Sequence, residues 1–202
     1  MAGELIIDCS GNLVLDCSKT NLLINCVPYT ASYTSSAVAH FRAGNGRSSG
    51  DWEIGIGPST QEIKQNGQIA WPNNSYVDFS LYYSGPNGGL TASAYGTTVM
   101  WAPSSSIPND SSSYRVRIDY SASPGYTSQI ATENVTLTIN NTTHSFADML
   151  VTSGESTSSF SYPHQLGIYS WMLSGSIGLG WSGSYPNASR LQTIVRVQRQ
   201  VS

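Results

Sequence analysis

The sequence predicts an all-β protein: an antiparallel β-sandwich or jelly-roll-like domain, preceded by a short three-stranded N-terminal repeat module. Apolar and polar residues alternate with a period of two through most of the chain, as they do in half-buried strands. Gly, Pro and Asn separate these runs at intervals of roughly 8–12 residues, which is typical of sandwiches and barrels. The 202 residues suit one large domain, or one domain and a small module.

The N-terminal module, residues 1–28, is predicted from a pattern that occurs three times, at 5–9, 13–17 and 22–26. Each copy has three aliphatic residues, then Asp or Asn, then Cys, and the polar connections between copies favour an antiparallel meander. Aliphatic side chains would face both sides of this sheet, so the main domain or another chain must cover it. An interwoven trimer like a viral fibre shaft is the alternative. The residues expected to mediate assembly are Leu5, Ile7, Leu13, Leu15, Leu22 and Ile24.

The three cysteines, Cys9, Cys17 and Cys26, all lie in the repeat. Their spacing matches no zinc pattern, and the nearest histidine is His40. An odd number excludes a complete set of disulfides within one chain. We therefore expect reduced, buried thiols, no metal site and no cofactor.

The main domain is expected at 37–202, after a polar segment that begins beyond Pro28. Strands are expected at 37–42, 52–56, 68–71, 76–83, 90–95, 97–101, 114–120, 134–140, 166–173, 177–181 and 193–197. Hairpin turns are expected at 85–89 and 140–141, and surface loops at 104–113 and 152–159. A single helical turn is allowed only at 146–151.

Charged residues make up 10% of the chain, against about 25% in an average domain. Such a Ser-, Thr- and Gly-rich, lysine-poor composition is common in virion components, adhesins and lectins. The net charge of −3 argues against nucleic-acid binding. After Glu155 the only charged residues are Arg190, Arg196 and Arg199, which would form a solvated strand face or a head-to-tail contact between copies.

The sequence has no secretory-signal pattern at its start and no apolar run of about 20 residues that could span a membrane. The expected location is the virion, or otherwise the cytoplasm.

Signals for an enzyme are weak, and we expect none. The G-x-G-x-x-G at 178–183 has no acidic residue after it and no helical context, so a glycine-rich strand is expected. Asp51 and Glu53 would share one strand face. Such a pair could serve glycoside hydrolysis or calcium binding, but charge on an exposed edge strand is the simpler interpretation.

Aromatic residues are the better indication of a binding site. The chain has 5 Trp and 12 Tyr but only 4 Phe, and Trp and Tyr suit sugar stacking and wet interfaces. The candidate carbohydrate-binding residues are Trp71, Asn73, Asn74, Tyr76, Asp78 and Tyr82.

The first functional hypothesis is a non-enzymatic structural virion protein, such as a phage or virus decoration, fibre or tail component. It would act as a homo-oligomer, such as a trimer, or with other virion proteins. The alternative is a lectin or receptor-binding head for cell-surface glycans. A second alternative is a β-type pore-forming toxin, with 166–181 as the refolding segment.

Overall fold

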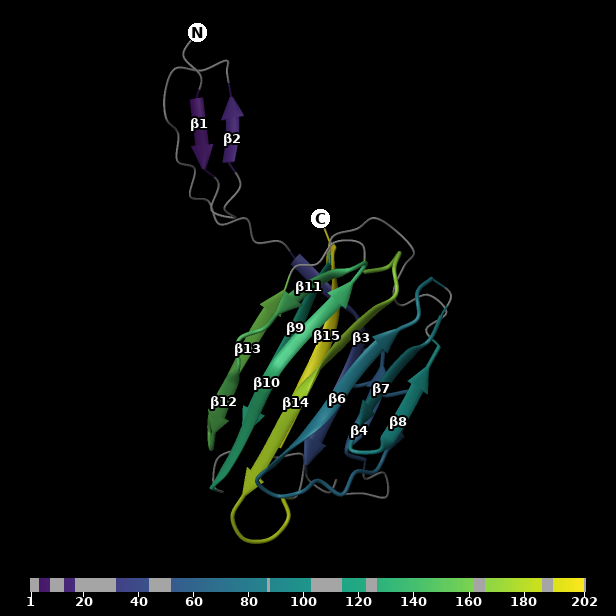
Figure 1. Cartoon of the computed structure of the whole chain (residues 1–202), viewed down its shortest axis with the longest axis vertical. Helices are drawn as coiled ribbons and strands as arrows, with labels where there is room; N and C mark the ends of the chain where they lie inside the picture. Colours follow the sequence, from purple (N-terminus) through teal and green to yellow (C-terminus); the bar gives the residue numbers. More distant parts are fainter. Residues whose placement is uncertain are drawn as a thin grey trace. The chain divides into compact units, whose positions relative to one another are not determined.

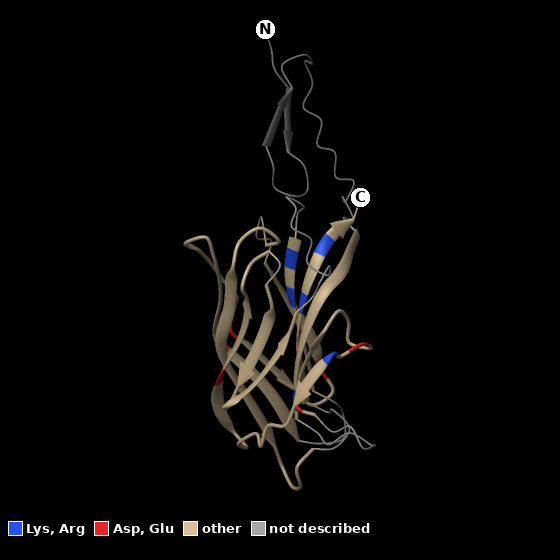
Figure 2. Cartoon of the chain, turned by 90° about the vertical axis from the view of Figure 1, so that its right-hand side faces the viewer, with Lys and Arg blue, Asp and Glu red and all other residues tan. Residues whose placement is uncertain are grey.

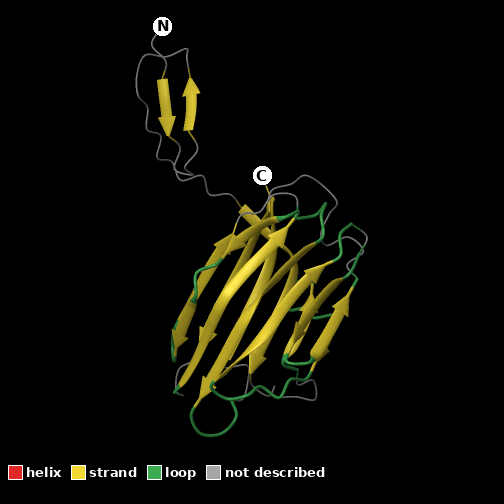
Figure 3. Cartoon of the chain, viewed as in Figure 1, coloured by secondary structure: helices red, strands yellow, loops and turns green. Residues whose placement is uncertain are grey.

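The computed structural model describes residues 4–7, 13–16, 32–43, 52–86, 88–102, 114–122, 127–161, 166–186 and 191–201. The chain divides into two compact units, Met1–Ser32 with Val201–Ser202 and Tyr33–Gln200. Every regular element in the described ranges is a strand, and none is a helix (Figure 3).

The first unit contains β1 (Glu4–Ile7) and β2 (Leu13–Asp16), which pair antiparallel. These strands coincide with the first two copies of the repeat, and Leu5 is the register partner of Leu15. Ile7 is likewise the partner of Leu13. Leu22, Ile24 and the three cysteines lie outside the described residues, so the third strand of the predicted meander stays a prediction.

The second unit contains two antiparallel sheets that face each other, a β-sandwich-like architecture (Figure 1). The first sheet has the order β13 (Ser156–Ser161), β9 (Tyr114–Ala122), β15 (Leu191–Val201), β3 (Ser32–Ala43), β4 (Ile54–Gly57), β5 (Gln65–Gly67). The second has the order β11 (Thr142–Ser145), β10 (Ser128–Ile139), β14 (Trp171–Trp181), β6 (Ser75–Tyr83), β7 (Leu90–Ala94), β8 (Thr97–Trp101), and β12 (Met149–Thr152) also pairs with β10.

Eight of these strands pair in a nested order. The earliest, β3, pairs with the last, β15; β6 pairs with β14, β9 with β13, and β10 with β12. Successive pairs lie in alternate sheets: β3–β15 and β9–β13 belong to the first sheet, and β6–β14 and β10–β12 to the second. The remaining strands extend the sheets at their edges.

Alternation explains the core between the sheets. In β6 the residues Val77, Phe79 and Leu81 point inward and are buried. Phe41 of the opposite sheet meets Phe79 edge to face, with ring centroids 5.3 Å apart. Such contacts bury the inner face of each sheet, whereas the residues between them in the sequence lie on the outer face, which is exposed to solvent.

The predicted turns at 85–89 and 140–141 are confirmed. The first connects β6 to β7, whose ends pair as Tyr83 with Leu90. The second connects β10 to β11 through Asn140 and Asn141, with φ of 45° and 62°, the left-handed values that a tight hairpin turn requires.

Four predicted segments are wrong. Residues 68–71 are irregular, and the strand lies just before them, at β5. The proposed helical turn at 146–151 is replaced by β12, and the proposed loop at 152–159 contains the start of β13. Residues 166–170 form a turn in which the Leu166 carbonyl accepts a hydrogen bond from the Trp171 indole, 3.1 Å long. The two segments that are strands form because β12 pairs with β10 and β13 pairs with β9.

Candidate functional site

Side chains on the outer face of the second sheet form rows across the strands, because register partners stand side by side. One row contains only small hydroxyl side chains: Thr136, Ser174, Ser80, Ser93 and Thr98. The next row, Thr138, Met172, Tyr82, Thr91 and Met100, contains three larger side chains, those of Met172, Tyr82 and Met100. The surface therefore steps down from the second row to the first.

A depression of about 550 Å³ lies over the hydroxyl row. We call it the serine groove. Its side chains come from β6, β7, β8, β10, β14 and one turn: Asp78, Ser80, Ser93, Tyr95, Thr98, Asn134, Ser174 and Ser176. The volume falls within the range of about 300–1,000 Å³ that is usual for small-molecule sites.

Tyr95 stands at one end of the groove, in the two-residue turn between β7 and β8. Its φ is 44° and that of Gly96 is 79°, the combination of a type I′ turn, which usually has Asn before Gly. A tyrosine at positive φ is strained by roughly 1–2 kcal/mol. Its side chain is nevertheless 53% exposed. Tyr95 is therefore a strained, exposed aromatic residue at the edge of the groove, which makes it a candidate for ligand contact.

A β-bulge in β10 forms the opposite end. The register with β14 shifts between Glu133 and Thr136, and Asn134 there has φ of 55°. The Asn134 N–H donates to the Asp148 carboxylate over 2.9 Å. A Cβ at Gly175 would lie 2.9 Å from the Val135 Cα, so glycine lets the bulge approach the floor closely.

The lining combines hydroxyl, amide and carboxylate side chains with apolar surface from Phe79 and Ala94, and it contains no Lys or Arg. The Ser93 and Thr98 hydroxyls are 2.9 Å apart, and the Ser176 hydroxyl donates to Asp78 over 3.0 Å. Each hydroxyl keeps further hydrogen-bonding capacity. Asp78 is the one carboxylate among the lining residues, whereas glycoside hydrolysis ordinarily requires a pair. The groove is therefore equipped to bind polyhydroxylated ligands.

Three of the candidate carbohydrate-binding residues, Tyr76, Asp78 and Tyr82, lie exposed on the outer face of β6. The Tyr76 ring lies over Gly178, where an added Cβ would be 3.1 Å from its Cε1. A hydrogen bond from its phenol to Glu133 raises the pKa of Tyr76. Tyr76 therefore packs across β14 and contacts Glu133 of β10 on the outer face of the sheet.

The other three do not line the groove. Trp71 is only 5% exposed, and its indole N–H donates to the Arg42 carbonyl over 2.8 Å. Asn73 brackets the Trp181 backbone with two hydrogen bonds of 2.9 Å, and Asn74 occupies a turn with φ of 54°. The structure removes Trp71 from the candidate surface because the core buries it.

Most of the groove was missed by sequence reasoning. Ser80, Ser93 and Ser174 come from three strands that become neighbours only in the folded sheet. The one local signal was Tyr95-Gly96 between two β runs, a dipeptide in the position of a hairpin turn.

The proposed carboxylate pair is also revised. Glu53 is buried, and its Oε2 accepts the Ile69 N–H over 3.1 Å, so it satisfies a buried backbone donor; Asp51 lies outside the described residues. The G-x-G-x-x-G segment is the end of β14 and a turn, as expected. Across the described ranges, no three His, Cys, Asp or Glu side chains cluster in a way that could hold a metal ion.

No known protein-family model matches the chain. A search of curated proteins likewise gives no significant match. Within the described ranges no helix is long and apolar enough to cross a membrane. The segment 166–181, the refolding segment of the toxin alternative, is a turn followed by β14, which pairs with β10 and β6 on its two sides.

Proposed function

We propose that the chain is a non-enzymatic carbohydrate-binding head of an oligomeric, virion-type structural protein, and that the serine groove binds a neutral saccharide. The observation that carries this proposal is the groove itself, a hydroxyl-lined depression with an exposed, strained tyrosine at one end.

The chemistry of the groove matches that of a sugar. Saccharide hydroxyls both donate and accept hydrogen bonds, as do the Ser and Thr side chains of the floor. The Tyr95 ring offers an aromatic face for the C–H side of a pyranose, together with a polar hydroxyl. Because Asp78 provides the only formal charge of the lining, an acidic sugar would be repelled and a neutral one is favoured.

The nested pairing supports a jelly-roll topology for the second unit. Eight strands that pair first with last and inward in turn form two Greek keys, and this arrangement recurs in viral capsid and lectin domains. Topology alone does not define function. It adds to the low charge and the scarcity of lysine, and together they favour a virion component that meets host glycans.

The first unit supports assembly into a homo-oligomer or with other virion proteins. Leu5 and Leu15 are register partners in a two-stranded pair, and so small a sheet needs covering to be stable. Light scattering on the full chain is expected to give an oligomer, and Leu5→Asp to shift it towards monomer. A wild-type chain that is monomeric at every concentration tested would contradict the assembly part.

The binding part is tested with an array of neutral glycans. Wild type is expected to bind, and Tyr95→Asn, which keeps a favourable Asn-Gly turn, is expected to lose binding. Tyr169→Asn is the matched control, because Tyr169 is an exposed tyrosine that does not line the groove. A blank array at high protein concentration, or equal loss in both variants, would refute carbohydrate binding at this site.

A further inference from the structure

The outer face of the first sheet carries a second depression, of about 310 Å³. It lies over β13, β9 and β15, and its lining shares no residue with the serine groove. The side chains that matter here are Arg117, Asp119, Ser156, Gln192, Ile194 and Arg196. The geometry points to a second binding site, for an acidic saccharide whose carboxylate or sulfate is held by Arg117 and Arg196.

The two arginines are cross-strand register partners. Like charges placed directly opposite each other destabilise a sheet, so an anion between the two guanidinium groups is favourable. Asp119 partly supplies it: the Arg117 Nε donates to its Oδ1 and the Arg196 Nε to its Oδ2, the latter over 2.5 Å. One carboxylate shared by two guanidinium groups leaves a net charge of +1.

The hydrogen-bond donors of this pair are only partly used. Both arginines contact Asp119 through Nε, and the Arg117 Nη2 also donates to the Ser158 hydroxyl over 3.2 Å. Among the described residues, the Nη atoms of Arg196 have no protein acceptor. Two N–H donors in a planar fork match the oxygens of a carboxylate or sulfate.

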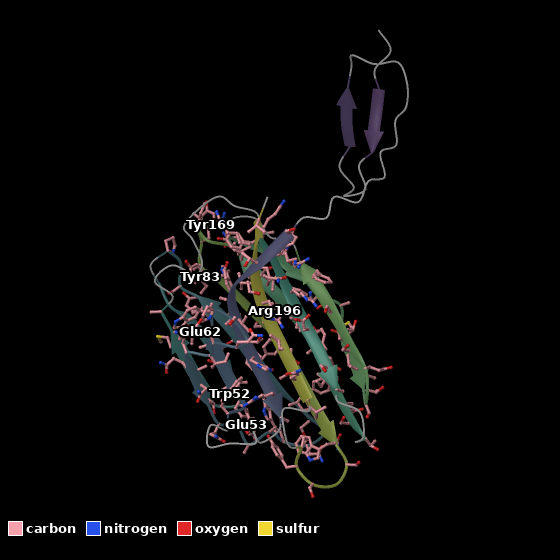
Figure 4. All side chains as sticks on the ribbon, turned by 180° about the vertical axis from the view of Figure 1, so that it is seen from behind. Trp52, Glu53, Glu62, Tyr83, Tyr169 and Arg196 are labelled. Carbon is pink, nitrogen blue, oxygen red and sulfur yellow. The ribbon has the colours of Figure 1, made fainter. Side chains whose placement is uncertain are left out.

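A third arginine adds to the positive potential. Arg115 lies two residues before Arg117, on the same face of β9, where its Nε donates to Gln198 over 2.7 Å and its guanidinium lies 4.0 Å from the Tyr33 ring centroid. Figure 2 shows blue bands on neighbouring strands close to the C-terminus. In Figure 4, which views the first sheet from outside, Arg196 is labelled near the middle of this face.

The rest of the depression fits the body of a sugar. Ser121 and Ser156 supply hydroxyls, and the mostly buried Ile194 supplies an apolar floor. Gln192 is held in place because its Oε1 lies 2.9 Å from the Nε2 of buried His40. With that oxygen accepting from His40, the Gln192 amide N–H₂ keeps its donors for a ligand.

Isothermal titration of the full chain with two acidic sugars, 3′-sialyllactose and 3′-sulfolactose, tests the site. Lactose, which lacks the acidic group, is the neutral comparison. Arg196→Gln is expected to weaken binding of the two acidic sugars by about tenfold, the loss of a charge-assisted hydrogen bond. Lys64→Gln removes an exposed cation elsewhere and is expected to leave both affinities unchanged. Tyr95→Asn is expected to leave acidic-sugar binding unchanged, which separates this site from the serine groove.

Asp119→Asn provides a second variant in case Arg196→Gln does not fold. It removes a negative charge beside the ligand, so acidic-sugar binding is expected to become tighter. The proposal is overturned if neither acidic sugar binds, if Arg196→Gln matches wild type, or if Lys64→Gln weakens binding equally. It is also overturned if free sulfate binds as tightly as 3′-sulfolactose, because the site would then hold an oxyanion with no contribution from the saccharide.

Discussion

Acidification provides a sharp test of the packing around His40. This residue lies on β3 with 6% of its surface exposed, and its ring meets Trp52 edge to face at 5.1 Å. Burial lowers the pKa of His40 from 6.5 to about 4. Burial is the largest cause of this shift; the hydrogen bond to Gln192 opposes it, and the nearby Arg42 and Arg196 add to it.

The size of the effect follows from the difference between the two states. Above pH 6.5 His40 is neutral in the folded and the unfolded chain, so stability is complete. Between pH 6.5 and pH 4 the unfolded chain binds a proton that the folded chain does not, and the free energy of unfolding falls. A shift from 6.5 to about 4, at 1.36 kcal/mol for each pH unit, corresponds to a loss of about 3 kcal/mol.

Urea denaturation at several pH values measures this loss. Wild type should lose about 3 kcal/mol between pH 6.5 and pH 4, and His40→Gln, which cannot titrate, should lose much less over that window. Burial raises the pKa of Asp119, but its hydrogen bonds and ion pairs outweigh burial and hold this pKa below 3.8. The stability that Asp119 contributes is therefore lost at a lower pH than the stability that His40 contributes. Equal pH slopes for the two proteins would refute a buried, neutral His40.

Three further outcomes are expected. Tyr95→Asn should raise the free energy of unfolding by about 1 kcal/mol, because Asn tolerates positive φ, even as glycan binding is lost; a lower urea midpoint would contradict this. Gly175→Ala should cost about 1–3 kcal/mol through the contact with Val135, and an unchanged midpoint would show that the bulge can move. Trp71→Phe should cost about 1–3 kcal/mol, because the Arg42 carbonyl loses its donor, and neutral-glycan binding should be unchanged; lost binding in the folded variant would return Trp71 to the site.

Alternation allowed strands such as β6 and β9 to be predicted, because their buried positions are apolar and their outer positions are polar. It failed at β13, where Ser156, Thr157, Ser158 and Ser159 show no alternation. That segment is a strand because β9 supplies its hydrogen-bond partners. Trp71 illustrates a related limit: an aromatic residue in irregular backbone can pack inward as readily as outward.

The candidate groove could not be derived locally, because its rows run across strands. Ser80 and Ser174 are register partners although 94 residues separate them in the chain, and neither is distinctive by itself. Predicting the groove requires the strand order, and that order depends on the nested pairing of distant segments.

The alternation within each strand also accounts for the contrast between the two outer faces. Each of β6 and β9 buries one set of alternate residues in the shared core, so its other set is free to vary without affecting packing. The outer positions of β6 carry Asp78 and Ser80, whereas those of β9 carry Arg115 and Arg117. One sandwich therefore presents a neutral-to-acidic groove on one sheet and a cationic depression on the other. Because the two depressions share no lining residue, the two proposed sites can be altered independently by single substitutions.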